Sequence, residues 1–235
     1  MAETTDAGQE SPGGPAGKVL PIYFVADESG SMAPFVAQLN EGLDSLLKEL
    51  HKESMAAAKV RFAIIGFNDT ARCHLPPSDL RDVDSMPDLS AYNSTSFAAA
   101  FRELYSRIPT DVSQLKSEGY EVNRPAVFFL TDGVPNPGDN WEAPYAQLTS
   151  PEFRPHPNIL AFGIGDAEAE NIRKIASRRE YAFMVAPNVQ TGPALVEFAK
   201  ALTRSVVSSG SAMAKGTELQ VAKPKDFIAL DMEPV

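Results

Sequence analysis

The feature that most constrains the fold of this chain is its alternation between short apolar runs and amphipathic stretches. Four runs are almost entirely apolar, which is typical of strands that are buried on both faces. They cover residues 19–26, 60–67, 126–130 and 158–164, and a last strand is expected at residues 181–185. Helices are expected between the strands, where apolar residues recur about every three or four positions. These stretches are residues 34–50, 97–108, 167–177 and 193–208. The alternation predicts an α/β fold with a mostly parallel sheet covered by helices on both faces.

The charge balance and the cysteine count exclude several classes of protein. The 235 residues carry 21 Lys and Arg against 31 Asp and Glu, a net charge of −10. A nucleic-acid-binding protein needs a basic surface, and an anionic membrane would repel this chain. The single cysteine, Cys73, excludes an intrachain disulfide and a Cys₄ zinc site. No basic leader opens the sequence and no apolar run approaches the ~18 residues of a membrane helix, so we expect a cytoplasmic protein.

The two ends of the chain differ in composition from the body between them. Residues 1–17 consist mostly of small, polar and acidic residues, which predicts a disordered arm. Residues 209–235 follow the long helical stretch and form an extension with a moderately apolar centre at 227–230. This extension could dock on the body, add a strand to the sheet or bind a partner. The body, residues 18–208, is expected to be one domain.

Two aspartates follow apolar runs at equivalent places. Asp27 ends the first run and Asp132 follows the third. If these strands are neighbours, about 4.8 Å apart, both carboxylates lie at the same edge of the sheet, where ligands bind to folds of this type. At ~6 Å and an effective dielectric of ~20 their repulsion is roughly 3 kcal/mol. A divalent cation would offset this repulsion.

The neighbouring residues supply further oxygen donors. Asp27, Ser29 and Ser31 alternate along one loop, and Gly30 allows a tight turn between them. Thr95, just before the second helical stretch, is a candidate fifth donor. Carboxylate and hydroxyl oxygens suit Mg²⁺, Mn²⁺ or Ca²⁺ rather than zinc. The set leaves one coordination position for an outside oxygen.

The segment Asp27-Glu28-Ser29-Gly30-Ser31 resembles the D-x-S-x-S signature of von Willebrand factor A (VWA) domains. Thr95 and Thr131-Asp132-Gly133 fall where that family keeps the rest of its metal-ion-dependent adhesion site (MIDAS), and the resemblance covers residues 18–208. The sequence segments that most resemble bacterial VWA proteins of tellurium-resistance and stress gene clusters are VLPIYFVADESGSM, STSFAAAFREL and PAVFFLTDG.

This resemblance implies a doubly wound sheet with one antiparallel edge strand, which would lie at residues 72–75. It implies a metal site made by Asp27, Ser29, Ser31, Thr95 and Asp132. It also implies a protein–protein interaction module rather than an enzyme, in which an Asp or Glu of the partner completes the coordination of Mg²⁺. The identity of the partner, the resident metal and the oligomeric state stay open.

Simpler interpretations exist for several of these residues. The loop after Asp27 could be only a helix cap, Asp132-Gly133 only a hairpin turn, and Thr95 only the cap of its helix. Glu28 is expected to be a solvated neighbour of the ligands. Trp141 and Tyr145 could contact a partner or pack on the domain, and Cys73-His74 is expected to be hairpin surface or core.

Two other function classes compete with the interaction module. The first is a Mg²⁺-dependent phosphatase or hydrolase with Asp27 as nucleophile. That chemistry usually needs a second acid two residues later, where Ser29 stands. The second is a metal-free scaffold that works through its C-terminal extension.

Overall fold

The computed structural model describes residues 17–214 and 219–230, which include an eight-stranded sheet and six α-helices. The strands are β1 (Gly17–Asp27), β2 (Val60–Phe67), β3 (Ala71–Ser78), β4 (Tyr120–Val122), β5 (Ala126–Thr131), β6 (Asn158–Gly163), β7 (Ala182–Val185) and β8 (Phe227–Ala229). The α-helices are α1 (Val36–Lys52), α2 (Ser54–Ala57), α3 (Phe97–Ser117), α4 (Glu142–Thr149), α5 (Ala169–Ile175) and α6 (Thr191–Ala214). Short 3₁₀ turns lie at Gly30–Met32, Leu80–Asp82 and Arg179–Tyr181. The predicted N-terminal arm lies outside the described residues except for Gly17, which begins β1.

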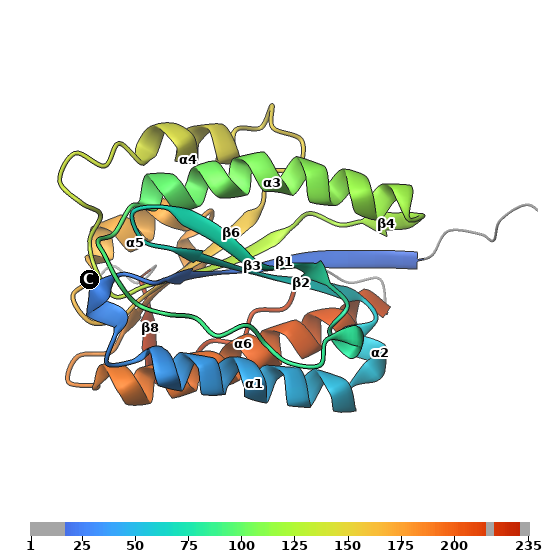
Figure 1. The fold of residues 1–235 in the computed structure, drawn as a ribbon, viewed down its shortest axis with the longest axis horizontal. Coiled ribbons are helices and arrows are strands. Elements are labelled where there is room, and N and C mark those ends of the chain that lie inside the picture. The colour runs from blue at the N-terminus through green and yellow to red at the C-terminus, as the bar shows by residue number, and fades with distance from the viewer. Residues whose placement is uncertain (1–16, 215–218, 231–235) are drawn as a thin grey trace, which may run out of the picture.

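The sheet has the strand order β3-β2-β1-β5-β6-β7-β8, and β4 pairs with the start of β1. Strands β2, β1, β5, β6 and β7 are parallel to one another. Helices cover both faces, with α3 and α4 on one side and α1 and α6 on the other (Figure 1). The predicted doubly wound, mostly parallel α/β sheet is therefore confirmed.

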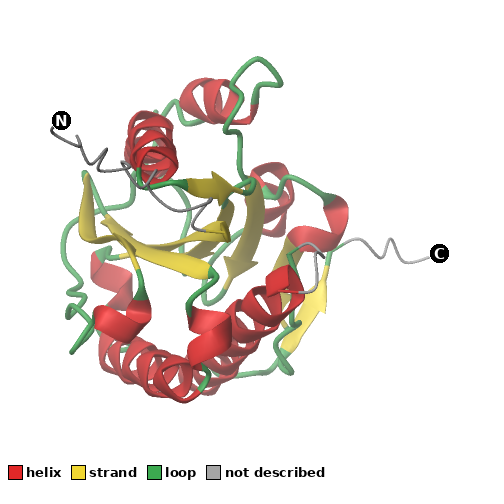
Figure 2. Ribbon diagram, turned by 90° about the vertical axis from the view of Figure 1, so that its right-hand side faces the viewer, coloured by secondary structure: helices red, strands yellow, loops and turns green. Residues whose placement is uncertain are grey.

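The apolar runs become strands because both of their faces are buried. In β1, Ile22 and Phe24 pack in one hydrophobic cluster, whereas Tyr23 and Val25 pack in the other. The first cluster contains the inner faces of α1 and α6, and the second contains those of α3 and α5. Alternate side chains of a strand point to opposite faces, so a central strand needs apolar residues at nearly every position. Figure 2 shows the sheet between the two helical layers.

Both edges of the sheet are antiparallel. The predicted edge strand at residues 72–75 is confirmed as the middle of β3, which pairs with β2 through the turn at 68–70. At the other edge, β8 pairs with β7, with Met184 opposite Ile228. Of the alternatives for the extension, the structure shows docking on the body and addition of a strand.

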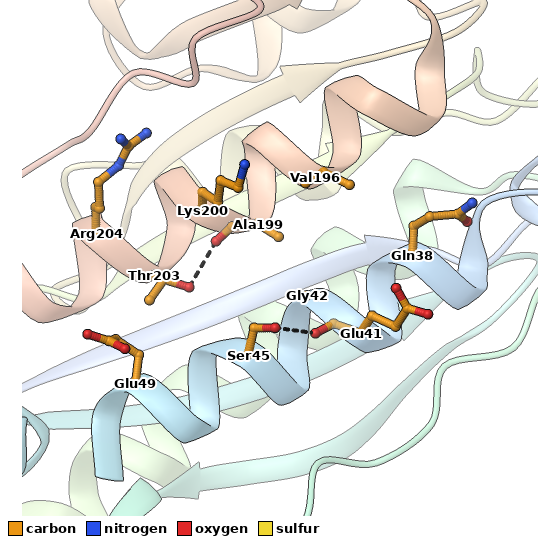
Figure 3. Close-up of a pocket in the computed structure, with 10 residues that line it drawn as sticks. All are labelled: Gln38, Glu41, Gly42, Ser45, Glu49, Val196, Ala199, Lys200, Thr203 and Arg204. Carbon is orange, nitrogen blue, oxygen red and sulfur yellow. Dashed lines mark hydrogen bonds between the residues drawn. The ribbon is translucent and has the colours of Figure 1, made fainter. Parts of the chain in front are cut away.

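Helices α1 and α6 pack closely, and α6 continues past residue 208 to Ala214. Gly42 of α1 faces Ala199 of α6, and a Cβ atom on Gly42 would lie 2.5 Å from the Ala199 Cβ (Figure 3). A groove of about 470 Å³ lies between the helices, with Glu41 and Glu49 on one wall and Lys200 and Arg204 on the other. No helix within 17–214 and 219–230 has the length and apolar character needed to span a bilayer.

Candidate metal centre

The sheet brings Asp27 and Asp132 to the same edge. Strands β1 and β5 are parallel neighbours, with Ala26 opposite Leu130, so Asp27 and Thr131 are the last residues of adjacent strands. Asp132 follows directly. The two carboxylates are buried, with exposed fractions of 1% for Asp27 and 4% for Asp132. The parallel pairing of β1 and β5 therefore brings the two side chains together, as predicted.

A continuous set of hydrogen bonds joins four of the five predicted ligands. The Ser29 backbone N–H donates to Asp27 Oδ1 at 2.9 Å. The hydroxyls of Ser29 and Ser31 lie 3.0 Å apart, and Ser31 Oγ donates to Asp132 Oδ1 at 2.8 Å. A hydroxyl therefore bridges the two aspartate-bearing loops, and all these oxygens lie in one cluster.

The electrostatics of the cluster favour a cation. Burial raises the pKa of Asp27 to about 6, and the nearby Asp132 charge adds to this, although hydrogen bonds from Ser29 and Thr131 act in the opposite direction. Burial also raises the pKa of Asp132, and the charge of Asp166 contributes, whereas the hydrogen bond from Ser31 lowers it. Two acids whose ionised forms are disfavoured at one place gain most from a positive neighbour.

Thr95 reaches the site on a separate loop. Its backbone N–H donates to Asn136 Oδ1 at 3.1 Å, and its carbonyl accepts from the Asn136 N–H at 2.9 Å. The Gly30 N–H donates to the Asn93 carbonyl at 2.9 Å, which ties this loop to the loop after Asp27. A Cβ atom on Gly133 would lie 4.0 Å from Thr95 Oγ1, so the hydroxyl lies beside the backbone that follows Asp132.

Two of the simpler interpretations are wrong. The cap of α3 is Ser96, whose Oγ accepts from the Ala99 N–H at 3.1 Å, and not Thr95. Asp132-Gly133 is not a hairpin turn, because β5 pairs in parallel with the next strand, β6. Capping and a hairpin turn therefore do not account for Thr95 and Asp132.

Glu28 corrects another expectation, since it is buried (4% exposed) rather than solvated. Its Oε2 accepts from His74 Nε2 at 3.0 Å, and its Oε1 accepts from the Ser90 N–H at 2.9 Å. A Cβ atom on Gly66 would lie only 2.0 Å from Glu28 Oε2, so the carboxylate lies directly over that glycine. The glycine within the apolar run 60–67 was a signal of this close approach.

Trp141 and Tyr145 pack on the domain. Trp141 is 3% exposed, and its ring contacts those of Phe97 and Phe101. The Tyr145 hydroxyl donates to the Ile175 carbonyl at 3.0 Å. Neither residue forms a free partner-binding surface beside the carboxylates.

Thr131 and Asn136 contact the predicted ligands, although neither was among the ligands expected from the sequence. Thr131 is fully buried, and its hydroxyl donates to Asp27 Oδ2 at 2.6 Å and accepts from the Gly133 N–H at 3.3 Å. It thereby fixes the orientation of the Asp27 carboxylate. Two features of the sequence could have indicated these contacts. Thr131 ends an otherwise apolar strand, and Asn136 lies between two prolines.

The donor set fits a hard divalent cation. Its oxygens come from two carboxylates and three hydroxyls, which three loops supply together. Mg²⁺, Mn²⁺ and Ca²⁺ prefer such oxygen ligands. Within residues 17–214 and 219–230, no group of three or more His, Cys, Asp and Glu side chains is placed to hold a metal. The Asp27–Asp132 cluster is a candidate metal centre because its buried carboxylates and hydroxyls are joined by hydrogen bonds.

Comparisons with known proteins agree with this fold. The model of the von Willebrand factor type A domain matches residues 22–197. No curated protein sequence matches the chain. Among solved structures, the pilus adhesin SpaC of Lactobacillus rhamnosus GG is 14% identical, with a TM-score of 0.63 over 81% of this chain and 31% of SpaC.

Two metal-containing structures are also similar. Proximal thread matrix protein 1 of the mussel byssus, with a zinc-occupied MIDAS motif, has a TM-score of 0.51 at 18% identity, covering 82% of this chain and 47% of that one. Manganese-loaded TRAP protein of Plasmodium vivax has a TM-score of 0.50 at 19% identity, covering 69% and 64%. This chain spans less than two thirds of each of the three solved chains. The family model covers most of the sequence, and the chain belongs to the von Willebrand factor type A domain family.

Proposed function

We propose that this VWA domain is a protein–protein interaction module that binds a divalent cation, Mg²⁺ in the cell, at a MIDAS. The proposed ligands are Asp27, Ser29, Ser31, Thr95 and Asp132. The observation that carries the proposal is the hydrogen-bonded cluster in which Ser29 and Ser31 connect the two buried aspartates across the ends of β1 and β5.

Each of these residues would contribute differently to binding a cation. Asp27 and Asp132 supply the negative charge, and the hydroxyls of Ser29, Ser31 and Thr95 supply neutral oxygens. Thr131 holds the Asp27 carboxylate through its 2.6 Å hydrogen bond. Glu28 ties the loop after Asp27 to the segment that leads to Thr95. The bound cation would offer one open position to a carboxylate from a partner protein.

The similar structures support this type of site. The mussel protein carries zinc in its MIDAS motif, and the Plasmodium protein is loaded with manganese. Both are divalent ions, and the choice of Mg²⁺ for this chain rests on its all-oxygen donor set. SpaC is a pilus adhesin, which agrees with a binding role for the domain.

The cellular setting is the part of the proposal that rests on sequence resemblance. The segments around Asp27, Thr95 and Asp132 resemble bacterial VWA proteins of tellurium-resistance and stress clusters. We therefore propose a cytoplasmic role in such a stress response, without an enzymatic activity of its own.

A pull-down of the full chain from a bacterial lysate tests the interaction. Wild type is compared with Asp132→Ala, and with Asp44→Ala, which removes an exposed charge on α1. We expect a partner that is retained with Mg²⁺, lost in EDTA and lost with Asp132→Ala, but retained with Asp44→Ala. Equal retention by all three proteins in EDTA contradicts the proposal.

The hydrolase alternative is tested with wild type and Asp27→Asn. Mg²⁺-dependent turnover of a generic phosphate ester that disappears in Asp27→Asn would replace the interaction module with an enzyme. We expect no turnover above that of the Asp27→Asn variant.

A further inference from the structure

A second cluster of polar residues lies at the amino ends of the parallel strands, whereas the candidate metal centre lies at their carboxyl ends. Arg124 precedes β5, Asn158 begins β6, and Arg178 precedes the short turn that leads into β7. These strands are parallel, so their amino ends meet at one edge. The Asn158 N–H donates to the Pro125 carbonyl at 2.8 Å, which fixes two of the three segments relative to each other.

The third segment is also held in place. The Ser177 N–H donates to the Ile159 carbonyl at 3.0 Å, and Ser177 Oγ accepts from the Ile159 N–H at 2.9 Å. The guanidinium of Arg178 lies over the ring of Tyr181, 5.4 Å from its centroid. The backbone beside both arginines is therefore hydrogen-bonded to the amino ends of the strands.

Two adjoining cavities share these residues. Their volumes are about 350 and 360 Å³, and Arg124, Asn158 and Arg178 line both. Asn123 adds an amide to the first cavity, and His156 adds an imidazole to the second. No Asp or Glu of the described residues lines either cavity, although the chain as a whole has a net charge of −10.

Another cavity of the same protein shows the contrast. The cavity beside β3 and the end of α3 also contains arginines, but four acidic residues line it with them. There, Asp79 Oδ2 lies 3.3 Å from Arg61 Nη1 and 2.6 Å from Arg81 Nη2. Those guanidinium groups are already paired with a carboxylate, and that cavity has no excess of positive charge.

The two arginines at the amino edge are not paired in this way. Arg124 makes no ion pair within the described ranges. Arg178 Nη1 lies 3.9 Å from Glu180 Oε1, and both side chains are more than half exposed. A contact of this length between exposed groups contributes little and leaves the guanidinium donors available.

We propose that Arg124, Arg178 and Asn158 form a binding site for a phosphate monoester. Each guanidinium offers a planar fork of N–H donors, which matches phosphate oxygens in a bidentate manner. A monoester carries nearly two negative charges and three acceptor oxygens, enough for two arginines and an amide. The two cavities that share these residues would bind the remainder of the ligand, which is either a small molecule or a phosphorylated peptide.

Titration calorimetry of the full chain in EDTA tests this site separately from any metal centre. The probes are inorganic phosphate, a phosphoserine peptide and its unphosphorylated counterpart, all at constant ionic strength. We expect saturable binding of the phosphorylated probes and none of the unphosphorylated peptide. Arg124→Gln and Arg178→Gln are each expected to weaken binding about tenfold, the equivalent of one charged hydrogen bond.

Control variants separate recognition from loss of charge or fold. Arg102→Gln removes the same charge from an exposed position on α3 and is expected to bind as wild type. Arg178→Lys keeps the positive charge but loses the planar pair of N–H donors of the guanidinium, so we expect an affinity between those of wild type and Arg178→Gln. Tighter binding of the peptide than of inorganic phosphate assigns the ligand to a phosphorylated protein, and the reverse assigns it to a small phosphate. No saturable binding by wild type, or wild-type affinity in both Arg→Gln variants, overturns the proposal.

Discussion

The Asp27 carboxyl group is one of the buried acids that make the stability of the metal-free protein depend on pH. Its pKa is about 6 in the folded protein because of burial, against 3.8 for an ordinary aspartate. The folded state therefore binds more protons than the unfolded state between about pH 4 and pH 6. The contribution of this group to stability is complete below pH 4 and is lost as the pH rises through 6.

We predict that in EDTA the free energy of unfolding falls between pH 4 and pH 7, on the order of 3 kcal/mol from Asp27. The change Asp27→Asn removes the titrating group, so the fall should be smaller in that variant. Urea unfolding at both pH values measures the difference. An equally steep fall in Asp27→Asn would assign the pH dependence to other groups.

Glu28 is a second residue whose role follows from its contacts. Its carboxylate is the partner of His74 Nε2 and of the Ser90 N–H, so removing it leaves the buried imidazole without its acceptor. We predict that Glu28→Ala lowers the free energy of unfolding in EDTA by about 1–3 kcal/mol. Glu28→Gln keeps an acceptor oxygen and should lose less. Equal losses in the two variants would show that packing rather than hydrogen bonding is responsible.

At the scale of elements, β8 shows how the C-terminal extension is attached. Phe227 is 2% exposed and meets the ring of Phe162 edge-on at 6.0 Å, and the Leu230 carbonyl accepts from Arg173 Nε at 3.3 Å. Since β8 lies at the far edge of the sheet from β1, its side chains do not contribute to the metal centre.

We predict that Phe227→Ala destabilises the protein by about 3–5 kcal/mol, as is usual for a buried phenylalanine. The rise in melting temperature on adding Mg²⁺ or Mn²⁺ should be the same as in wild type. A thermal melt with and without metal measures both quantities. Loss of the metal response in a folded Phe227→Ala variant would mean that the extension helps to build the centre.

The elements that the sequence predicted are those with a strong apolar pattern. Strands β1, β2, β5 and β6 are buried on both faces along most of their length, and this makes their apolar runs conspicuous. Strands β4 and β8 have only three residues each, too few to show a period. Helix α4 was missed because its apolar residues do not form one stripe. Helix α6 extends to Ala214 through small residues, where Gly210 approaches the Ala56 backbone closely.

At the scale of the whole molecule, parallel topology explains why the candidate metal centre was visible in the sequence. Adjacent parallel strands end at one edge, so Asp27 and Asp132 converge although they are far apart in the chain. The orienting contacts of Thr131, Asn136 and His74 were not visible, because each depends on a partner 41 to 104 residues away. Such contacts follow from tertiary packing and have no local pattern.

The topology also places acidic and basic residues at opposite ends of the parallel strands. The carboxyl ends of β1 and β5 carry the buried acids, and Arg124 and Arg178 lie at the amino ends of β5 and β7 in cavities that no acidic residue of the described ranges lines. A cation at one edge and a phosphate at the other would bind without sharing a residue. Binding at the two edges should therefore be separable by mutation.

The most direct test of the central claim is calorimetric titration of Mn²⁺ and Mg²⁺ into the full chain. We predict one saturable site in wild type and in Asp44→Ala, and no such site in Asp27→Ala or Asp132→Ala. At a metal concentration of about 100 Kd the site should add about 2.7 kcal/mol to the stability of the wild type. Absence of binding by wild type, or unchanged binding by Asp27→Ala and Asp132→Ala, would show that these aspartates do not form a metal site.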